Sequence, residues 1–220
     1  MRVWRPPSVG LQIRFEAARL LGRLGVADPF VIDALITALK DRAVVDLPIP
    51  SSSQGAPAPQ ERRTIAGAAA ESLGWIGPSG VKALPALERV LPTIEKETDD
   101  AVRSASVLQV HPTQTDYLRC VGAITLIDTK RTDLIPVIVA LLDARADAQT
   151  IPRMHVRRVA VSLLGRIGKR ASPAFDDLRH ILRSEREVLK SGECLKDDQE
   201  ELIRLIEEAI ERISDVPRKR

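Results

Sequence analysis

A pair of glycines three residues apart occurs three times along the chain, in LLGRLG at 20–25, SLGWIG at 72–77 and LLGRIG at 163–168. Such a pair could hold a phosphate or could allow close helix packing. A Walker loop needs four residues between its first glycine and Gly-Lys, followed by Ser or Thr. Only Arg166 and Ile167 separate the third pair, and Arg170 follows Lys169. The spacing therefore argues against nucleotide binding.

Metal binding and nucleophilic catalysis lack the residue patterns that they require. The three histidines, His111, His155 and His180, are scattered, and neither Cys120 nor Cys194 belongs to a CxxC motif. No Gly-x-Ser-x-Gly elbow is present. We therefore predict no catalytic residues, no metal, no cofactor and no enzymatic activity. Cys120 lies in an apolar helical pattern, which favours a small core residue over a reactive thiol.

The distribution of charged residues gives a stronger indication of function than these motifs do. The chain has 33 Lys and Arg against 30 Asp and Glu, and its basic residues gather between Arg153 and Arg186. Such a cluster can bind phosphates or an acidic partner. It can equally form a solvated face that is balanced by the acidic segment 193–215. Only 3% of the residues are aromatic, which argues against stacking on single-stranded nucleic acid.

Candidate partner-binding residues come from this cluster and from the middle of the glycine motif. The residue after the first glycine varies between copies and is Arg23, Trp75 or Arg166, while the glycines stay the same. The complete set of candidates is Arg23, Trp75, Arg153, Arg157, Arg158, Arg166, Lys169, Arg170, Arg179 and Arg183.

The glycine motifs belong to a longer repeat with apolar positions in register. The anchors are Gly22, Gly74 and Gly165, with Thr125 as the equivalent in a weaker copy. The column one residue before the anchor contains Leu21, Leu73, Ile124 and Leu164, and the column two after it contains Leu24, Ile76, Ile127 and Ile167. The column five before it contains Ala17, Ala69, Cys120 and Ala160. Spacings of three and four predict amphipathic helices.

Each copy is predicted to be two helices joined by a short turn. Asp28 and Ser172 are expected as N-caps that are followed by Pro29 and Pro173 at the first helical position. The first glycine of each motif is expected to allow close helix packing, and the second to end the helix in a left-handed turn. Thr125 and Gly165 are 40 residues apart, which is close to the roughly 40 residues of a two-helix solenoid unit.

The segments AARLLGRLG, AAAESLGWIG and VAVSLLGRIG, together with the helices that follow them, resemble short bacterial HEAT repeats of the type also found in phycobilin lyases. The resemblance implies an all-α, right-handed α-solenoid used mainly as a binding scaffold. We expect a single solenoid with copies at about 11–41, 61–96, 115–144 and 153–190, a capping helix at about 197–214 and a flexible insertion at about 43–60. Either residues 1–8 cover the first helix with Trp4, or the chain is a fragment of a longer array.

The main functional prediction is a non-catalytic scaffold that presents a solenoid surface to a protein. Two alternatives remain open. One is binding of nucleic acid or another acidic partner by the basic fourth copy, and the other is a lyase or DNA glycosylase of a HEAT-like enzyme branch. No apolar run reaches the roughly 18 residues of a membrane span, so a cytoplasmic protein is expected.

Overall fold

The computed structural model describes residues 9–48, 60–104, 112–142, 151–191 and 196–214. These residues divide into two compact units, one ending at Asp128 and the other beginning at Thr129. Residues 1–8, including Trp4, lie outside the described part of the chain.

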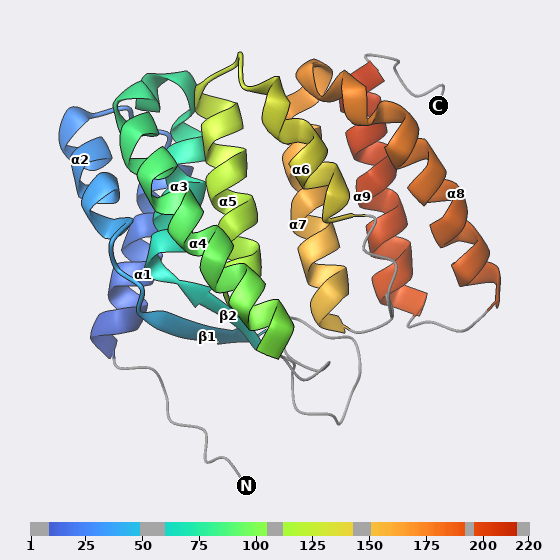
Figure 1. The fold of residues 1–220 in the computed structure, drawn as a ribbon, viewed down its shortest axis with the longest axis horizontal. Coiled ribbons are helices and arrows are strands. Elements are labelled where there is room, and N and C mark those ends of the chain that lie inside the picture. The colour runs from blue at the N-terminus through green and yellow to red at the C-terminus, as the bar shows by residue number, and fades with distance from the viewer. Residues whose placement is uncertain (1–8, 49–59, 105–111, 143–150, 192–195, 215–220) are drawn as a thin grey trace, which may run out of the picture. The chain divides into compact units, whose positions relative to one another are not determined.

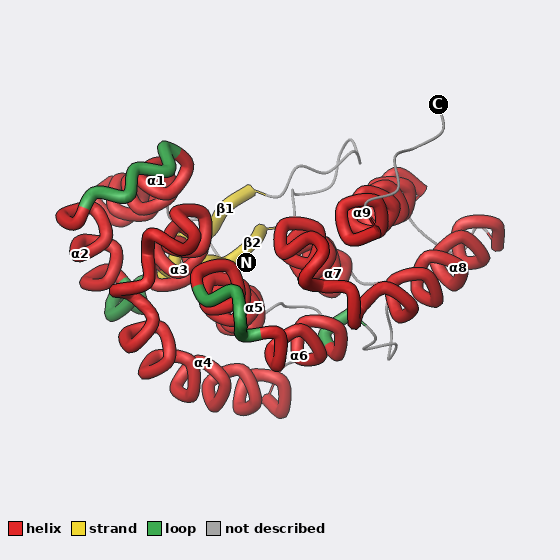
Figure 2. The backbone as a smooth tube through the Cα atoms, turned by 90° about the horizontal axis from the view of Figure 1, so that it is seen from above, coloured by secondary structure: helices red, strands yellow, loops and turns green. Residues whose placement is uncertain are grey.

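The first unit consists of helices in two rows and one small hairpin. Its elements are α1 (Val9–Arg23), α2 (Pro29–Ala38), β1 (Val44–Pro48), β2 (Gln60–Thr64), α3 (Ile65–Ile76), the 3-10 helix η1 (Gly77–Ala83), α4 (Leu84–Ser104) and α5 (Pro112–Ile127). Helices α1, α3 and α5 lie side by side in one row, and α2 and α4 form the other (Figures 1 and 2).

The second unit repeats the pairing of helices. Its elements are the 3-10 helix η2 (Thr132–Leu134), α6 (Ile135–Ala140), α7 (Ile151–Ile167), the 3-10 helix η3 (Gly168–Ala174), α8 (Phe175–Ser191) and α9 (Lys196–Ser214). Helix α9 packs against both α7 and α8. The predicted all-α, solenoid-type fold is confirmed by these elements.

The first glycine of each motif lies where two helices approach closely. A Cβ atom on Gly22 would lie 2.4 Å from the Cβ of Ser72 in α3, which is closer than two non-bonded carbon atoms can approach. A Cβ on Gly74 would lie 3.0 Å from the Cα of Ala123 in α5. The predicted packing role is therefore confirmed, and each glycine faces a small residue of the next helix.

The second glycine of each motif ends a helix. Gly25, Gly77 and Gly168 have φ angles of 62°, 70° and 64°, in the left-handed region that side chains disfavour. The three reversals follow the ends of α1, α3 and α7. The interpretation of the motif as a helix terminus, drawn from its spacing, is confirmed.

Aliphatic side chains fill the interior, as a low aromatic content requires. In α3, Ala66, Ala68, Ala69 and Ala70 are all fully buried, and Phe15 of α1 is a fully buried aromatic residue. Small side chains let the α1, α3 and α5 row pack tightly.

The hairpin differs from the flexible insertion that the sequence predicts at 43–60. Strand β1 pairs antiparallel with β2, from Val44 opposite Thr64 to Pro48 opposite Gln60. Val45 is buried, and Asp46 pairs with Arg62 across the strands at 3.1 Å. Valines favour extended backbone, and a cross-strand ion pair supports the register. Residues 49–59 of the insertion lie outside the described part of the chain.

One of the two predicted N-caps is wrong. The Asp28 carboxylate accepts a 2.8 Å hydrogen bond from the Phe30 backbone N–H, as predicted, with Pro29 opening α2. Ser172 and Pro173 instead lie inside η3, and α8 begins at Phe175. The residues that the sequence pattern assigns to the first turn of the α-helix therefore belong to the 3-10 helix η3.

Replacing Gly22 with Ala tests the close approach of α1 and α3. The added Cβ overlaps Ser72, so we expect the free energy of unfolding in urea to fall by about 1–3 kcal/mol. Gly10 is the matched control, because a Cβ there meets nothing within 4 Å. Gly10→Ala should leave the stability unchanged or raise it by up to about 1 kcal/mol. Equal effects of the two variants would contradict the packing role.

Candidate functional site

The outer side of α1 exposes a line of large apolar side chains. Val9, Ile13 and Leu20 of α1 are 75%, 61% and 55% exposed, and Leu24, the residue after α1, is 70% exposed. The Leu24 N–H donates to the Leu20 carbonyl at 3.0 Å, so Leu24 continues the helical spacing. At 3.6 residues per turn, these four positions fall within about 60° of the helix circumference. We call them, with Ala17 between them, the α1 stripe. Isolated exposed apolar residues are common, whereas a contiguous line of them marks an interaction surface.

The opposite side of α1 is also apolar and is buried. Phe15, Ala18 and Gly22 lie against α3, where the Ser72 hydroxyl donates a 2.7 Å hydrogen bond to the Ala18 carbonyl. Helix α1 therefore has apolar residues on two opposite faces. A helix of this kind is ordinarily covered on both sides.

Comparison of sister positions shows that α1 has the residues of an interior helix. Ile76, Ile127 and Ile167 are 8%, 3% and 4% exposed, whereas Leu24 in the same column is 70% exposed. The sequence places Leu24 in the same apolar column, but in the first copy this position is exposed. Within the described part of the chain, no helix packs on the stripe.

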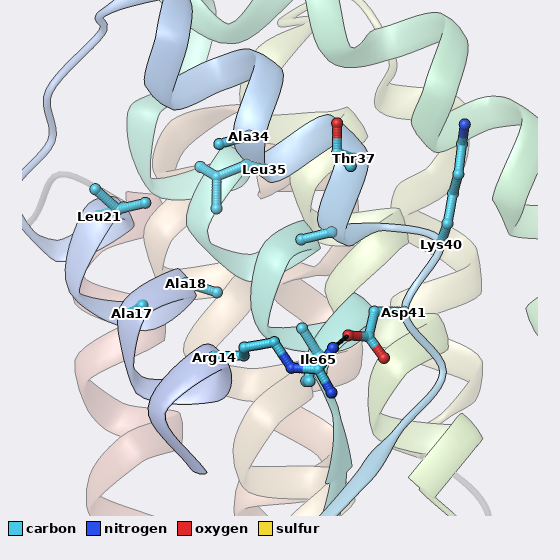
Figure 3. A pocket seen from close by; sticks show the side chains of 11 residues that line it. Arg14, Ala17, Ala18, Leu21, Ala34, Leu35, Thr37, Lys40, Asp41 and Ile65 are labelled. Atoms are coloured by element: carbon cyan, nitrogen blue, oxygen red, sulfur yellow. Dashed lines mark ion pairs between the residues drawn. The ribbon is translucent and has the colours of Figure 1, made fainter. Parts of the chain in front are cut away.

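A cavity of about 670 Å³ adjoins the stripe, between α1 and α2 (Figure 3). Its walls are mainly the small and apolar side chains of Ala17, Leu21, Ala34, Ala38 and Ile65. Ala17 and Leu21 connect the cavity with the stripe. The volume lies within the roughly 300–1,000 Å³ range of ligand-binding pockets. The lining is mostly apolar, as it is in such pockets.

Charged side chains flank this apolar surface. Arg14 pairs with Asp41 at 2.9 Å, and Arg19 pairs with Glu16 at 3.3 Å. Lys40 stands apart from the Arg14–Asp41 pair at the edge of the cavity (Figure 3). Within the described part of the chain, neither Lys40 nor Arg23 forms an ion pair. The surface thus has an apolar centre and two cations available at its edges.

A second cluster of polar groups lies inside the first unit and has a structural role. The Thr64 hydroxyl caps α3 by accepting from the Gly67 N–H at 2.9 Å, and it donates to Asp116 Oδ2 at 2.5 Å. A Cβ on Gly67 would lie 1.7 Å from Asp116 Oδ1, so the carboxylate rests on the α3 backbone. Arg119 is also buried beside it. The cluster ties β2 to α3 and α5.

Burial and the arginines shift the pKa values of this cluster in opposite directions. Burial raises the pKa of Asp116, and the Arg119 charge and the Thr64 hydrogen bond only partly offset that effect. At Glu71 burial also acts to raise the pKa, but the charges of Arg119 and Arg63 outweigh it and lower the value. The Arg63 guanidinium donates directly to Glu71.

Cys120 lies one helical turn after Asp116 and is fully buried, as the sequence predicts. Burial, with a further contribution from the Asp116 charge, raises the pKa of its thiol to about 12. The thiolate is the reactive form, so Cys120 is an inert core residue at neutral pH.

The structure uses much of the basic fourth copy internally. Arg157 is buried and donates to Glu185, whose carboxylate also accepts from Gln199 of α9. Arg158 pairs with Glu201 of α9 at 3.1 Å. Arg157 is therefore not available to a partner, which corrects its place among the candidates. These pairs favour the alternative in which the acidic C-terminal helix balances the basic charge.

The other candidate residues are scattered over both units. Arg166, Lys169, Arg179 and Arg183 are exposed, and Arg170 and Trp75 are half-buried. The Arg179 guanidinium lies over the Phe175 ring, 5.6 Å from its centroid. The Arg153 side chain lies outside the described part. Of the candidates, Arg23 is the one that borders the α1 stripe. Sequence reasoning did not single out the stripe residues, because an apolar position in a helical pattern does not by itself indicate exposure.

No described helix is both long and apolar enough to cross a membrane. Among the described residues, no group of three or more His, Cys, Asp or Glu side chains could hold a metal ion.

No family model and no curated protein matches the chain. Among solved structures, the chain is similar to the complex of CpcE and CpcF of phycocyanin lyase from Nostoc sp. PCC7120. The identity is 20%, the match covers 92% of this chain and 91% of that chain, and the TM-score is 0.31. At that TM-score, no site residue or activity is carried from the complex to this chain.

The match corrects one prediction. The sequence predicts that the protein is not an enzyme, whereas the solved structure to which it is similar is, by its name, a lyase. The exclusion of enzymatic activity is therefore wrong as a conclusion from missing motifs. The absence of a familiar motif does not exclude a site assembled from residues far apart in the sequence.

Replacing Glu71 with Gln tests the cluster around Arg63 and Arg119. A carboxylate whose pKa is lower in the folded than in the unfolded state stabilises the folded state at pH values above the unfolded pKa, here 4.5. That contribution is lost as the pH falls through the folded pKa. We expect Glu71→Gln to lower the free energy of unfolding by about 1–3 kcal/mol at pH 7. The difference from the unmodified protein should shrink below pH 4.5.

Urea titrations at a series of pH values provide the measurement for Glu71→Gln. Glu187→Gln is the control, because Glu187 is 71% exposed in its pair with Lys190 and should change stability by less than about 0.5 kcal/mol. A difference that stays constant with pH would contradict the assignment.

Replacing Arg157 with Met tests its structural role. The change leaves the Glu185 carboxylate buried without its cation, so we expect a loss of about 3–5 kcal/mol in unfolding free energy. Arg183 is exposed and forms no ion pair with a described residue, so Arg183→Met should cost less than about 0.5 kcal/mol. Chemical denaturation of both variants gives the comparison, and similar stabilities would refute the internal role of Arg157.

Proposed function

We propose that this protein binds another protein through the α1 stripe. The observation that supports the proposal is the burial contrast between sister positions, in which Leu24 is 70% exposed and its equivalents at Ile76, Ile127 and Ile167 are at most 8% exposed. Helix α1 thus carries the side chains of a helix that is covered on both sides. A partner protein supplies the missing cover.

The physical driving force is burial of the stripe. Covering a Leu or Ile side chain contributes roughly 1.5–3 kcal/mol relative to leaving it in water. Ile13, Leu20 and Leu24 lie on a rigid helix that is already fixed against α3 by Phe15 and Gly22. The surface is therefore preorganised, which reduces the entropic cost of binding. Phe30, at the start of α2, is a further exposed apolar side chain of the first unit, at 85%.

The test compares partner capture by matched surface variants. The double variant Leu20→Asp, Leu24→Asp places two charges in the stripe, whereas Val81→Asp places one on a 60% exposed valine of η1 outside the stripe. Each tagged protein is expressed in cells of its source, cross-linked and isolated, and captured proteins are quantified by mass spectrometry.

We expect a discrete protein captured by the unmodified chain to be retained by Val81→Asp and lost by the double variant. Thermal unfolding should stay unchanged in both variants, because the substituted side chains are exposed. Capture of the same protein by the double variant, or no specific capture by the unmodified chain, would contradict the proposal.

A further inference from the structure

The glycine anchors of this chain share one packing pattern, which bears on what kind of helix can cover α1. Gly22 lies against Ser72, Gly74 against Ala123 and Gly165 against Ala209 of α9. Ser72 and Ala123 each stand two positions before the anchor of their own copy. A glycine on one helix thus faces a small residue on the next, and the two backbones approach closely.

The first copy has a large residue at that position, Leu20, which is 55% exposed. The fourth copy also has a leucine there, Leu163, and the copy before it has Thr125 rather than a glycine as its anchor. A helix approaching α1 as closely as α3 approaches it on the other side would overlap Leu20. The covering helix must instead stand further away and accept Leu20 in a hole between its own side chains, as knobs enter holes in helix packing. A helix that brings a glycine into close contact, as Gly22 does with Ser72, does not fit that requirement.

The charges at the edges of the stripe specify the partner further. Arg23 is the last residue of α1 and lies about 60° from Leu20 in the helix projection, and Lys40 lies at the edge of the adjoining cavity. Neither forms an ion pair within the described residues, whereas Arg14 and Arg19 pair with Asp41 and Glu16. Carboxylates on the partner would complement the two available cations.

Helix α9 shows the same chemistry within this chain. Its buried side consists of Leu202, Ile206, Ala209 and Ile213, and its borders carry carboxylates. Glu201 pairs with Arg158 at 3.1 Å and Glu207 pairs with Arg186 at 2.6 Å. An acidic amphipathic helix therefore covers α7 and α8 by combining apolar burial with ion pairs to arginines.

We infer that the occupant of the α1 stripe is an acidic amphipathic helix of a partner protein, with a hole for Leu20 and a carboxylate for Arg23. The inference rests on the proposed function and adds the chemistry of the partner. It also excludes a glycine-bearing repeat helix, whether from another repeat protein or from a second copy of this chain.

The first arm of the test identifies the bound segment. Leu24 is replaced with photoreactive p-benzoylphenylalanine, the protein is irradiated in cells of its source, and the cross-linked peptide is sequenced by mass spectrometry. We expect a predicted amphipathic helix rich in Asp and Glu from another protein. A basic, non-helical or glycine-bearing repeat segment, or a segment of this same chain, would overturn the inference. No specific cross-link would instead count against the proposed function itself.

The second arm measures binding of the cross-linked segment, made as a synthetic peptide, to purified variants. Leu20→Ala gives α1 the small residue that Ser72 and Ala123 provide elsewhere. If a hole accepts Leu20, the variant should bind about tenfold or more weakly, because a packed anchor is truncated. If a close-packing glycine helix binds, the variant should bind more tightly, and that result would overturn the inference.

Charge reversal completes the design. Arg23→Glu should weaken binding of the peptide by about fivefold or more at low salt, and the effect should diminish as salt is raised. Arg183→Glu is the matched control, since Arg183 is also exposed and lies on α8. Equal binding by the two variants would overturn the charge assignment. Circular dichroism of each variant confirms that the helices are intact.

Discussion

The structure depends on close contact between a glycine of one helix and a small residue of the next. Gly22 against Ser72 and Gly74 against Ala123 bring α1, α3 and α5 together with almost no side-chain volume between the backbones. The Ser72 hydroxyl adds a hydrogen bond to the Ala18 carbonyl at this crossing. With few aromatic residues, this tight arrangement lets alanines and aliphatic side chains form the core. The second glycines reverse the chain in so little space that the next helix can pack back on its neighbour.

The charged residues divide into internal pairs and available edges. Arg157 and Glu185 form a buried pair, and Asp116 rests on the α3 backbone beside Thr64. These groups hold elements in place, since a buried charge without its counterion is strongly destabilising. Arg23 and Lys40 have no such partner among the described residues and border an apolar surface. The distinction matters for function, because a count of arginines along the sequence does not separate structural cations from those that a partner can reach.

Helix α1 links these two features to binding. Its inner side follows the glycine packing pattern, and its outer side is apolar but carries Leu20 at the position where α3 and α5 have the small residues Ser72 and Ala123. The same helix is therefore fixed on one side and open on the other to a different kind of neighbour. A rigid helix with an exposed apolar stripe suits binding of a helix from another protein.

The sequence by itself determined the all-α class, the helix pairs and the roles of both glycines, because helical periodicity and the conformational freedom of glycine are local properties. It did not determine the β1–β2 hairpin, since the pairing of Asp46 with Arg62 joins two strands that are separated in the sequence by residues 49–59. Nor could it determine which apolar residues are covered. Leu24 and Ile76 occupy one column and have opposite burial, and Arg157 and Arg183 belong to one basic cluster although one is buried and the other exposed. Burial depends on which neighbouring helix is present in three dimensions, and only the tertiary structure decided that.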